Sequence, residues 1–358
     1  MHDVVVAGGG PAGLVVALEA ARAGMDVVVC EKRSGTIDKA CGEGLMPAAV
    51  RALAVLGVDP PGCDLHGIRY RQGDCLATAR FTSGPGRGVR RTALHGSLRA
   101  AVAAAGVPVL ERDVGGVVQH GDHVAAGGLR ARYLVAADGL HSPIRASLGL
   151  SLPPRPGSVA RWGQRRHFRL ADDADDARDA DAPAGGPLIA GDFVDVIWAR
   201  TAEAYLTPVA DGVLGVAVLS SVRAPFAEQL AAFPALAERL ARAMPVSDVR
   251  GAGPLRQQAR ARVAGRVLLV GDAAGYIDAL TGEGLALSIA AAGELVSCLR
   301  DGKPERYERA WRRTSRRSRL ITSGLLWARG RPAIGRAVVP AAAHLRPLFA
   351  VAVNQLAG

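Results

Sequence analysis

The 358-residue sequence has few aromatic residues and few cysteines. Phe, Trp and Tyr make up 4% of the chain, and no strip of alternating aromatic and basic residues, of the kind that stacks bases, is visible. This argues against nucleic acid as a partner, although the formal net charge is +11. The cysteines are five in number and form no CxxC pair, which disfavours a disulfide framework and a bound metal such as zinc.

Long hydrophobic runs and a signal peptide are also lacking. The chain starts directly with a strand-like segment, and no uninterrupted apolar run reaches the ~18 residues that a membrane-spanning helix needs. We therefore expect a soluble, cytoplasmic protein. Charge is distributed unevenly, because residues 172–181 are strongly acidic and residues 306–336 are rich in arginine. The acidic run contains few apolar residues and is predicted to be a solvated loop.

The N-terminal segment "DVVVAGGGPAGLVVALEAARAGMDVVVCEKR" has the pattern of a βαβ unit. Residues 3–7 and 27–31 are predicted to be buried strands, and residues 11–23 a helix that ends at Gly24. Glu31 ends the second strand, close to the ~20-residue offset expected for an acid that binds a ribose.

The turn of this unit carries a glycine fingerprint. Gly8, Gly10 and Gly13 follow the GxGxxG spacing. The first glycine permits a tight turn, the second lets the backbone approach a pyrophosphate, and the third lets helix and strand pack closely. The helix N-terminus then faces the phosphates. Together these features predict a dinucleotide site.

The rest of the chain alternates between several patterns. Strands are predicted around 66–82, 107–126, 132–137, 160–170, 193–220 and 266–270, and helices over 90–106, 225–242, 285–296 and 303–356, the last with breaks at Pro332, Pro340 and Pro347. Residues 193–220 predict an antiparallel meander, unlike the N-terminal βαβ unit. The fold class is therefore α/β with a second, antiparallel sheet.

Two further strand ends complete a set of three motifs. "AADG" (136–139) and "LLVGDAAG" (268–275) follow the fingerprint in an order and at separations that resemble FAD-dependent monooxygenases of the aromatic-hydroxylase type. Within that superfamily, "CGEGLMP" (41–47) and "GDAAGYIDALTGEG" (271–284) are similar to the branch of geranylgeranyl reductases and of hydroxylases associated with type III polyketide synthases. The resemblance extends over essentially the whole chain.

The resemblance implies a division of the chain into three parts. Residues 1–72, 90–155 and 258–300 would form a Rossmann-like FAD-binding domain, and residues 73–89 and 156–257 a substrate domain built on an antiparallel sheet. Residues 301–358 would form a C-terminal helical segment. This segment is expected to pack on the FAD-binding domain, with a lid over a hydrophobic substrate or a peripheral membrane contact as the alternatives.

The resemblance also implies the chemistry. FAD would be the cofactor and NADH or NADPH a transient electron donor, because only one dinucleotide fingerprint is present. The leading hypothesis is hydroxylation of a phenolic or polyketide-derived aromatic substrate by molecular oxygen, through a flavin C4a-hydroperoxide. One alternative is an enzyme that saturates isoprenoid double bonds, as geranylgeranyl reductases do. Another is a flavin-binding protein without turnover.

Site residues follow from the matching positions. Cofactor contacts are expected from Gly8, Gly10, Ala12, Gly13, Glu31, Lys32, Arg33, Gly44, Arg91, Val114, Asp138, Gly139, Gly271, Asp272, Gly282, Glu283, Gly284 and Leu285. Trp198 and Tyr205 are expected in the wall of the substrate pocket. Cys41 is a candidate thiol nucleophile, although Glu43 beside it opposes a low thiol pKa and favours a role as a pocket residue. His167 is a candidate base, or else a structural histidine.

Overall fold

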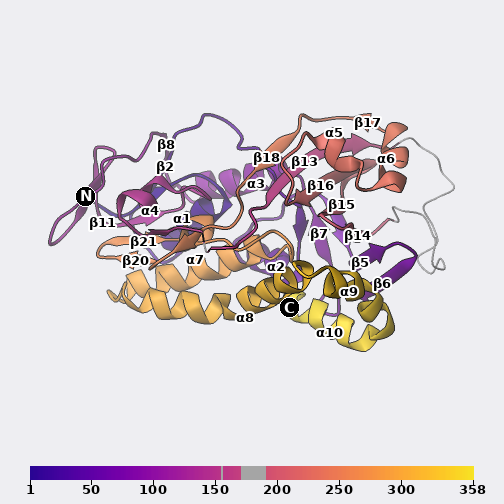
Figure 1. Cartoon of the computed structure of the whole chain (residues 1–358). Coiled ribbons are helices and arrows are strands. Elements are labelled where there is room, and N and C mark those ends of the chain that lie inside the picture. Colours follow the sequence, from indigo (N-terminus) through magenta and orange to yellow (C-terminus); the bar gives the residue numbers. More distant parts are fainter. Residues whose placement is uncertain (155, 171–190) are drawn as a thin grey trace.

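The fold is built on two large sheets (Figure 1). The computed structural model describes residues 1–154, 156–170 and 191–358. Parallel strands form the centre of the first sheet, in the order β21-β11-β1-β2-β8. Short antiparallel strands β20, β10 and β9 extend it. The bounds are β1 His2–Ala7, β2 Val27–Glu31, β8 Val109–Glu111, β9 Val118–Gln119, β10 Val124–Ala126, β11 Leu129–Ala136, β20 Val263–Ala264 and β21 Val267–Leu269.

Helices pack against this sheet and against one another. The helix α1 (Pro11–Arg22) contacts α3 (Arg91–Ala104) and α7 (Gly284–Arg300), and α7 also contacts α2 (Pro47–Val55). The last four residues of β1 and the inner face of α1 are buried, as expected for a parallel strand of β-branched residues that packs against a helix. The predicted βαβ unit is confirmed. The short helix α4 (Pro143–Ser147) and the 3₁₀ turn η1 (Gly271–Ala274) follow the strands that end in the second and third motifs.

The second sheet is mainly antiparallel and has the order β17-β13-β16-β15-β14-β5-β6, with β18 also paired to β13. Only β14 and β5 run parallel within it, among the described strands. The bounds are β5 Gly67–Gln72, β6 Cys75–Arg80, β13 Trp162–Arg169, β14 Phe193–Trp198, β15 Ala202–Ala210, β16 Val213–Ser220, β17 Met244–Pro245 and β18 Arg250–Ala252. The sequence-based division assigns residues 67–72 to the FAD-binding part, whereas β5 is hydrogen-bonded into this second sheet.

The two faces of the second sheet bury different apolar clusters. One face packs under α5 (Phe226–Leu230) and α6 (Pro234–Ala241). The predicted single helix over 225–242 is wrong, because Pro234 has no N–H to donate and begins α6 instead. The opposite face meets the C-terminal helices, which also cover β6. Two small sheets complete the fold, with strands β3 Gly44–Leu45, β4 Cys63–Leu65 and β7 Gly86–Gly88 in one, and β12 Ser151–Leu152 and β19 Gln258–Ala259 in the other.

The C-terminal segment forms three helices, α8 (Arg306–Arg329), α9 (Pro332–His344) and α10 (Arg346–Ala357). The expected breaks at Pro332 and Pro347 are confirmed, but the break at Pro340 is wrong, since α9 continues through it. In the described residues no single helix is long and apolar enough to span a bilayer; α9 and α10, bent by 101°, pass that test only when taken together. The predicted acidic loop at 172–181 lies outside the described residues.

Candidate cofactor and substrate site

The glycine turn between β1 and α1 leaves no room for side chains at two positions. Gly8 has a φ of +112°, and a Cβ there would lie 2.4 Å from the carbonyl oxygen of Ala137. A Cβ on Gly13 would lie 1.9 Å from the carbonyl oxygen of Gly8. The turn is therefore packed directly on the backbone of the second motif, and glycine is required at both positions for steric reasons.

The surroundings of this turn fit the phosphates of FAD. Within the described part of the chain, the N-cap residue Gly10 supplies no side-chain cap to α1, and a Cβ on Gly10 would meet no atom within 4 Å. The first N–H groups of α1 thus border open space, and a helix N-terminus favours anions. Arg91 begins α3, and its Nε is buried without a hydrogen-bond partner among the described atoms. An unpaired guanidinium N–H and free helix N–H groups suit a pyrophosphate.

Glu31, at the end of β2, is held as a carboxylate acceptor. Its Oε2 accepts the backbone N–H of Gly9 at 2.8 Å, and its Oε1 accepts the Nε of Arg33 at 2.8 Å. Burial acts to raise the pKa of Glu31, but the hydrogen bonds from Arg33 and Gly9 outweigh it and lower the pKa below its usual value. An ionised carboxylate at this place can accept hydroxyl groups of a ribose.

The second and third motifs meet at the edge where β11 and β21 end. Asp138 Oδ2 accepts the backbone N–H of Ile144 at 3.1 Å, so it caps α4, and burial raises the pKa of Asp138. A Cβ on Gly271 would lie 2.7 Å from the Cβ of Ala12, which brings the third motif against α1. Asp272 is one-third exposed and its Oδ2 lies 3.4 Å from the Nζ of Lys39. This carboxylate faces outward and can contact a cofactor.

The segment from Gly282 to Leu285 forms the start of α7. Gly282 has a φ of +68°, and a Cβ there would approach Met46 to 3.4 Å. Glu283 is the N-cap residue and makes no side-chain cap hydrogen bond in the described structure, and burial raises its pKa. The N–H groups at the start of α7 therefore remain available for the electron-rich edge of a flavin ring. Met46 shows that the loop of the "CGEGLMP" stretch packs against this helix start.

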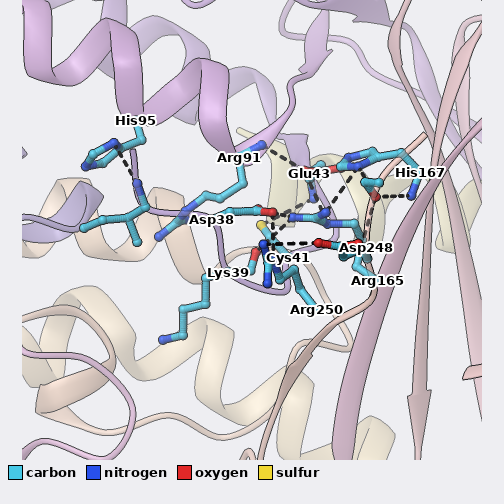
Figure 2. A network of polar contacts seen from close by, with 12 residues as sticks. Asp38, Lys39, Cys41, Glu43, Arg91, His95, Arg165, His167, Asp248 and Arg250 are labelled. Atoms are coloured by element: carbon cyan, nitrogen blue, oxygen red, sulfur yellow. Dashed lines mark hydrogen bonds and ion pairs between the residues drawn. The ribbon is translucent and has the colours of Figure 1, made fainter. Parts of the chain in front are cut away.

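Glu43 lies at the centre of a buried polar network in that loop (Figure 2). It is the one non-glycine residue with a positive φ in the described chain, at 61°, and it is 3% exposed. Its Oε1 accepts the backbone N–H of Arg91 at 2.8 Å, and its Oε2 lies 2.7 Å from the Nε2 of His167. One carboxylate thus joins the loop, the start of α3 and strand β13. The flanking glycines are not sterically required, since a Cβ on Gly42 would meet no atom within 4 Å and a Cβ on Gly44 would lie 3.5 Å from Val194.

His167 is engaged at both ring nitrogens. Arg165 can only donate, so its Nη1, 3.2 Å away, places the acceptor lone pair on Nδ1 of His167. The Nε2–H then donates to Glu43. The backbone N–H of His167 also donates to the Oγ of Ser247 at 2.9 Å. This geometry favours a positioning role for His167, and a role as base stays a prediction.

A second carboxylate continues the network. Arg165 forms an ion pair with Asp38, and the Nε of Arg250 donates to the Oδ2 of Asp38 at 3.2 Å (Figure 2). Burial acts to raise the pKa of Asp38, but the two guanidinium groups lower it overall. Residues 38–43, which precede β3, are thus attached to β13 and β18 of the second sheet. The position of this loop is therefore set by its contacts with the second sheet.

Cys41 lies in the same loop and is partly buried. Its Sγ accepts the backbone N–H of Glu43 at 3.4 Å. Tyr276 lines a cavity of about 40 Å³ beside the third motif. Burial raises the pKa of Tyr276 well above its usual value, and the charges of Asp272 and Asp278 act in the same direction. Tyr276 is therefore a protonated hydroxyl group next to the cofactor loops.

Trp198 and Tyr205 lie on the inner face of the second sheet, inside one apolar cluster. The hydroxyl of Tyr205 donates to the carbonyl oxygen of Leu280 at 2.8 Å, which joins the sheet to the loop before α7. Tyr70 lies between Trp198 and Phe349, with ring centroids 6.1 and 5.3 Å away. The two predicted wall residues are thus buried in the expected region, and their contact with substrate stays a prediction.

An ion cluster closes the far side of this region. Glu203 on β15 is fully buried and pairs with Arg161 and, at 2.5 Å, with the Nε of Arg329 from α8. Arg161 also lies 3.6 Å from Asp278. Burial raises the pKa of Glu203 in spite of its two arginine partners. The end of α8 is therefore attached to the second sheet.

The remaining predicted residues occupy the periphery of the site. Lys32 and Arg33 follow β2 at the surface, Gly44 lies in β3, and Val114 is buried near Gly127. No group of three His, Cys, Asp or Glu side chains that could hold a metal ion occurs in the described residues.

Several buried residues were not anticipated. His95 lies 3.0 Å from the carbonyl oxygen of Gly9 and accepts the N–H of Ile37, and burial lowers its pKa. Arg145 donates to the carbonyl oxygens of Ala273 and Leu140. Neither residue belongs to a local motif, so the sequence carried no signal for them. Glu43 did carry one, as a charged residue between two glycines.

Known proteins that bind or are named for flavin chemistry are similar to this chain in sequence and in fold. A family profile described as "FAD binding domain" matches residues 1–68 and 91–166. Digeranylgeranylglycerophospholipid reductase of Methanothrix thermoacetophila is 29% identical over 318 residues, which are 82% of this chain and 77% of that protein. Menaquinone reductase of Mycolicibacterium smegmatis is 57% identical over 56 residues, 16% of this chain and 14% of that protein.

A solved structure extends the comparison to the whole fold. A flavoprotein/dehydrogenase from Cytophaga hutchinsonii superposes with a TM-score of 0.78 at 19% identity, covering 99% of this chain and 93% of that one. The protein therefore has a mixed α/β FAD-binding fold with a C-terminal helical segment. Together with the named reductases, these matches support FAD as the cofactor and an FAD-dependent oxidoreductase as the class of enzyme.

Proposed function

We propose that this chain is an FAD-dependent enzyme that reduces carbon–carbon double bonds in a long hydrophobic substrate of the isoprenoid type. The observation that carries the proposal is one continuous apolar cluster. It begins at the cofactor loops with Met46 and Leu280, crosses the inner face of the second sheet, and reaches Val339 and Val353 of the C-terminal helices. These side chains pack on one another, so the cluster supplies an apolar lining and not an open cavity, and the proposal is that a hydrocarbon chain is accommodated along it. Two relatives with reductase names, one of a geranylgeranyl lipid and one of menaquinone, favour the same reaction.

Reduction of a double bond requires a hydride for one carbon and a proton for the other. Bound FAD, once reduced, supplies the hydride. The chain must supply the proton and keep water away. Tyr276, held protonated by its raised pKa, and the thiol of Cys41 are the proton donors in the described loops around the cofactor. The network of Glu43 fixes the loop that carries Cys41. NADH or NADPH is proposed to re-reduce the cofactor.

A second candidate is hydroxylation of a phenolic or polyketide-derived aromatic ring with NAD(P)H and molecular oxygen. The specific observation in its favour is the aromatic wall formed by Tyr70, Trp198, Tyr205 and Phe349. Aromatic faces bind flat rings well. In this reading Cys41 and Tyr276 only line the pocket.

Oxygen dependence separates the two reactions. The purified protein, loaded with FAD and supplied with NADH or NADPH, would be incubated with a geranylgeranyl-bearing quinone or lipid and with an alkyl-substituted phenol. The reductase proposal expects a product that has gained two hydrogens, formed equally well under strict anaerobiosis. A product that has gained one oxygen atom, and forms only in air, would establish the second candidate. Bound FAD without turnover of either substrate would contradict both.

Substitution of the proposed proton donors gives a sharper test. Tyr276→Phe and Cys41→Ala should both retain FAD. The loop that carries Cys41 is held mainly by the hydrogen bonds of Glu43, and phenylalanine keeps the ring of Tyr276. For a reductase, at least one of them should lower kcat by about 10²-fold or more, the range typical of a lost acid catalyst. If both retain full turnover, proton delivery from these residues is refuted.

A further inference from the structure

We propose that the exposed face of α8 is a docking surface for an anionic lipid bilayer. We define this face as Arg309, Arg313, Arg316, Leu320 and Trp327 of α8, together with Arg331, two residues beyond the end of the helix. The five helical residues follow one another at intervals of three, four and seven, so they lie on one side of α8, and Arg331 lies over the ring of Trp327. All are exposed, whereas Tyr307, Ala310, Trp311, Ser315 and Thr322 on the opposite side are buried. The proposal does not depend on which reaction the enzyme catalyses.

The charge of this part of the chain has one sign. After Glu308 the sequence contains ten arginines and neither aspartate nor glutamate up to its last residue. Three of the arginines on α8 are paired with acids from outside that stretch: Arg312 with Glu308, Arg313 with Glu294 and Arg329 with Glu203. The segment still carries a large excess of positive charge. Such an excess is attracted to anionic lipid headgroups.

The apolar residues on the face are large and exposed. Leu320 is 63% exposed and Trp327 is 55% exposed. The guanidinium of Arg331 lies 3.8 Å from the ring centroid of Trp327 and caps it. Tryptophan and arginine together are suited to the boundary between headgroups and acyl chains, where an indole ring is buried and a guanidinium stays in contact with phosphate.

The neighbouring helices add to this surface at the same end of the molecule. Leu345, Leu348 and Val351, at the corner between α9 and α10, are also more than half exposed. Figure 1 shows α8 and α10 along one edge of the molecule. Outward-facing leucine and valine at a helix corner are difficult to explain for a surface that meets only water.

The helices of this face also cover the apolar cluster that is proposed to hold the substrate, so a bilayer contact would bring lipid close to the substrate region. Val339 of α9 and Val353 of α10 belong to the same apolar cluster as Trp198 and Tyr205. Arg329, two residues from Trp327 along α8, pairs with the buried Glu203 of the substrate sheet. The helices that would touch the bilayer are therefore the helices that close the substrate region. A water-insoluble substrate could pass from lipid to protein without crossing water.

A second copy of the chain is a poorer occupant. Two copies facing each other through α8 would bring like charges together, which costs energy at a surface. A bilayer of anionic lipid instead complements both the arginines and the apolar side chains. We therefore commit to the lipid surface.

Flotation with lipid vesicles tests the proposal on the full, FAD-loaded chain. Wild type should float with vesicles of phosphatidylcholine and phosphatidylglycerol in equal parts, and about tenfold less with phosphatidylcholine alone. Binding should fall further between about 0.1 and 0.5 M salt, because screening lengths shorten over this range. Equal binding to both lipids, or no binding to either, overturns the proposal without any variant.

Two variants locate the contact. Leu320→Ser/Trp327→Ser should weaken partitioning about tenfold or more, and Arg331→Gln about fivefold. The control is Val222→Ser/Val249→Ser, which removes two exposed apolar side chains from the substrate domain and should bind like wild type. Circular dichroism and retained FAD establish that each variant is folded. If the double variant does not fold, Arg331→Gln still decides, since it leaves the core unchanged.

The alternative occupants give different results. If the protein binds a DNA duplex but not anionic vesicles, the proposal is overturned in favour of nucleic acid. If it forms a dimer that Leu320→Ser/Trp327→Ser abolishes, and does not float with vesicles, the face is an interface between copies. Unchanged vesicle binding by both α8 variants also overturns the assignment to this face.

Discussion

The hydrogen bond between Glu43 and His167 should couple the cofactor loop to the substrate sheet, and a double-mutant cycle measures that coupling. The proposed substitutions are Glu43→Gln, His167→Asn and both together. Glutamine keeps the size of the side chain and an oxygen that can still accept the N–H of Arg91. The backbone strain of the positive φ is the same for glutamine as for glutamate, so it does not contribute to the difference in stability. The change therefore removes mainly the charge facing His167 and Arg165.

The magnitude follows from burial and distance. Glu43 and His167 are 3% and 2% exposed, and their oxygen and nitrogen are 2.7 Å apart. A hydrogen bond to a charged group contributes about 1.5–3 kcal/mol, and breaking one partner of a buried pair costs about 3–5 kcal/mol. We expect each single substitution to lower the free energy of unfolding by about 2–4 kcal/mol, with a coupling energy of about 1.5–3 kcal/mol.

Urea unfolding of the FAD-loaded protein, followed by tryptophan fluorescence and by far-UV circular dichroism, would supply the four free energies. The matched control is the exposed i,i+4 pair of Glu238 and Arg242, 3.8 Å apart, replaced by glutamine in the same way. Its coupling should be below about 0.5 kcal/mol. A coupling for Glu43 and His167 no larger than that of the control would refute the idea that this contact fixes the loop.

Three further predictions concern the cofactor site. Gly13→Ala places a Cβ 1.9 Å from the backbone of Gly8, so the protein should lose bound FAD and its flavin absorbance, whereas Gly24→Ala, at the end of α1, should retain them. Because hydrogen bonds lower the pKa of Glu31, its contribution to stability is complete above the unfolded value of about 4.3 and is lost as pH falls through the lowered folded pKa. Glu31→Gln should remove that part of the pH dependence of urea unfolding, and an unchanged profile would contradict it. Gly215→Ala, whose Cβ would lie 2.7 Å from Oε2 of Glu43, should raise the Kd for FAD about tenfold or more by displacing that carboxylate, and equal FAD titrations would contradict the link between network and cofactor.

The local motifs of the chain were readable because their physical requirements are local. The turn at Gly8 to Gly13 needs glycines at fixed spacing, and a buried parallel strand needs a run of β-branched residues. Both conditions are visible within about thirty residues. The same holds for Asp138 and Gly271, each of which stands one residue beyond the residue that follows a buried strand.

The predicted domain boundaries and helix breaks were less accurate where tertiary packing overrides local sequence preference. Pro234 and Pro347 stand in the first turn of new helices, where the missing N–H of proline is tolerated, but α9 continues through Pro340. The sequence-based division missed that β5 belongs to the second sheet, because its partner β14 lies more than a hundred residues further along the chain. Pairing over such a distance leaves no trace in the local sequence.

The sequence alone therefore determined where the glycine turn, Glu31 and the start of α7 stand in the fold and predicted a cofactor contact for them, since each part is a short segment with its own steric rule. Only the tertiary structure decided what the stretch from Lys39 to Pro47 does. Glu43 meets Arg91, 48 residues away, and His167, 124 residues away, inside a region from which water is excluded. A buried carboxylate must find its partners in three dimensions, and burial gives those contacts their strength. For this reason the glutamate between two glycines, rather than the cysteine before it, holds the loop in place.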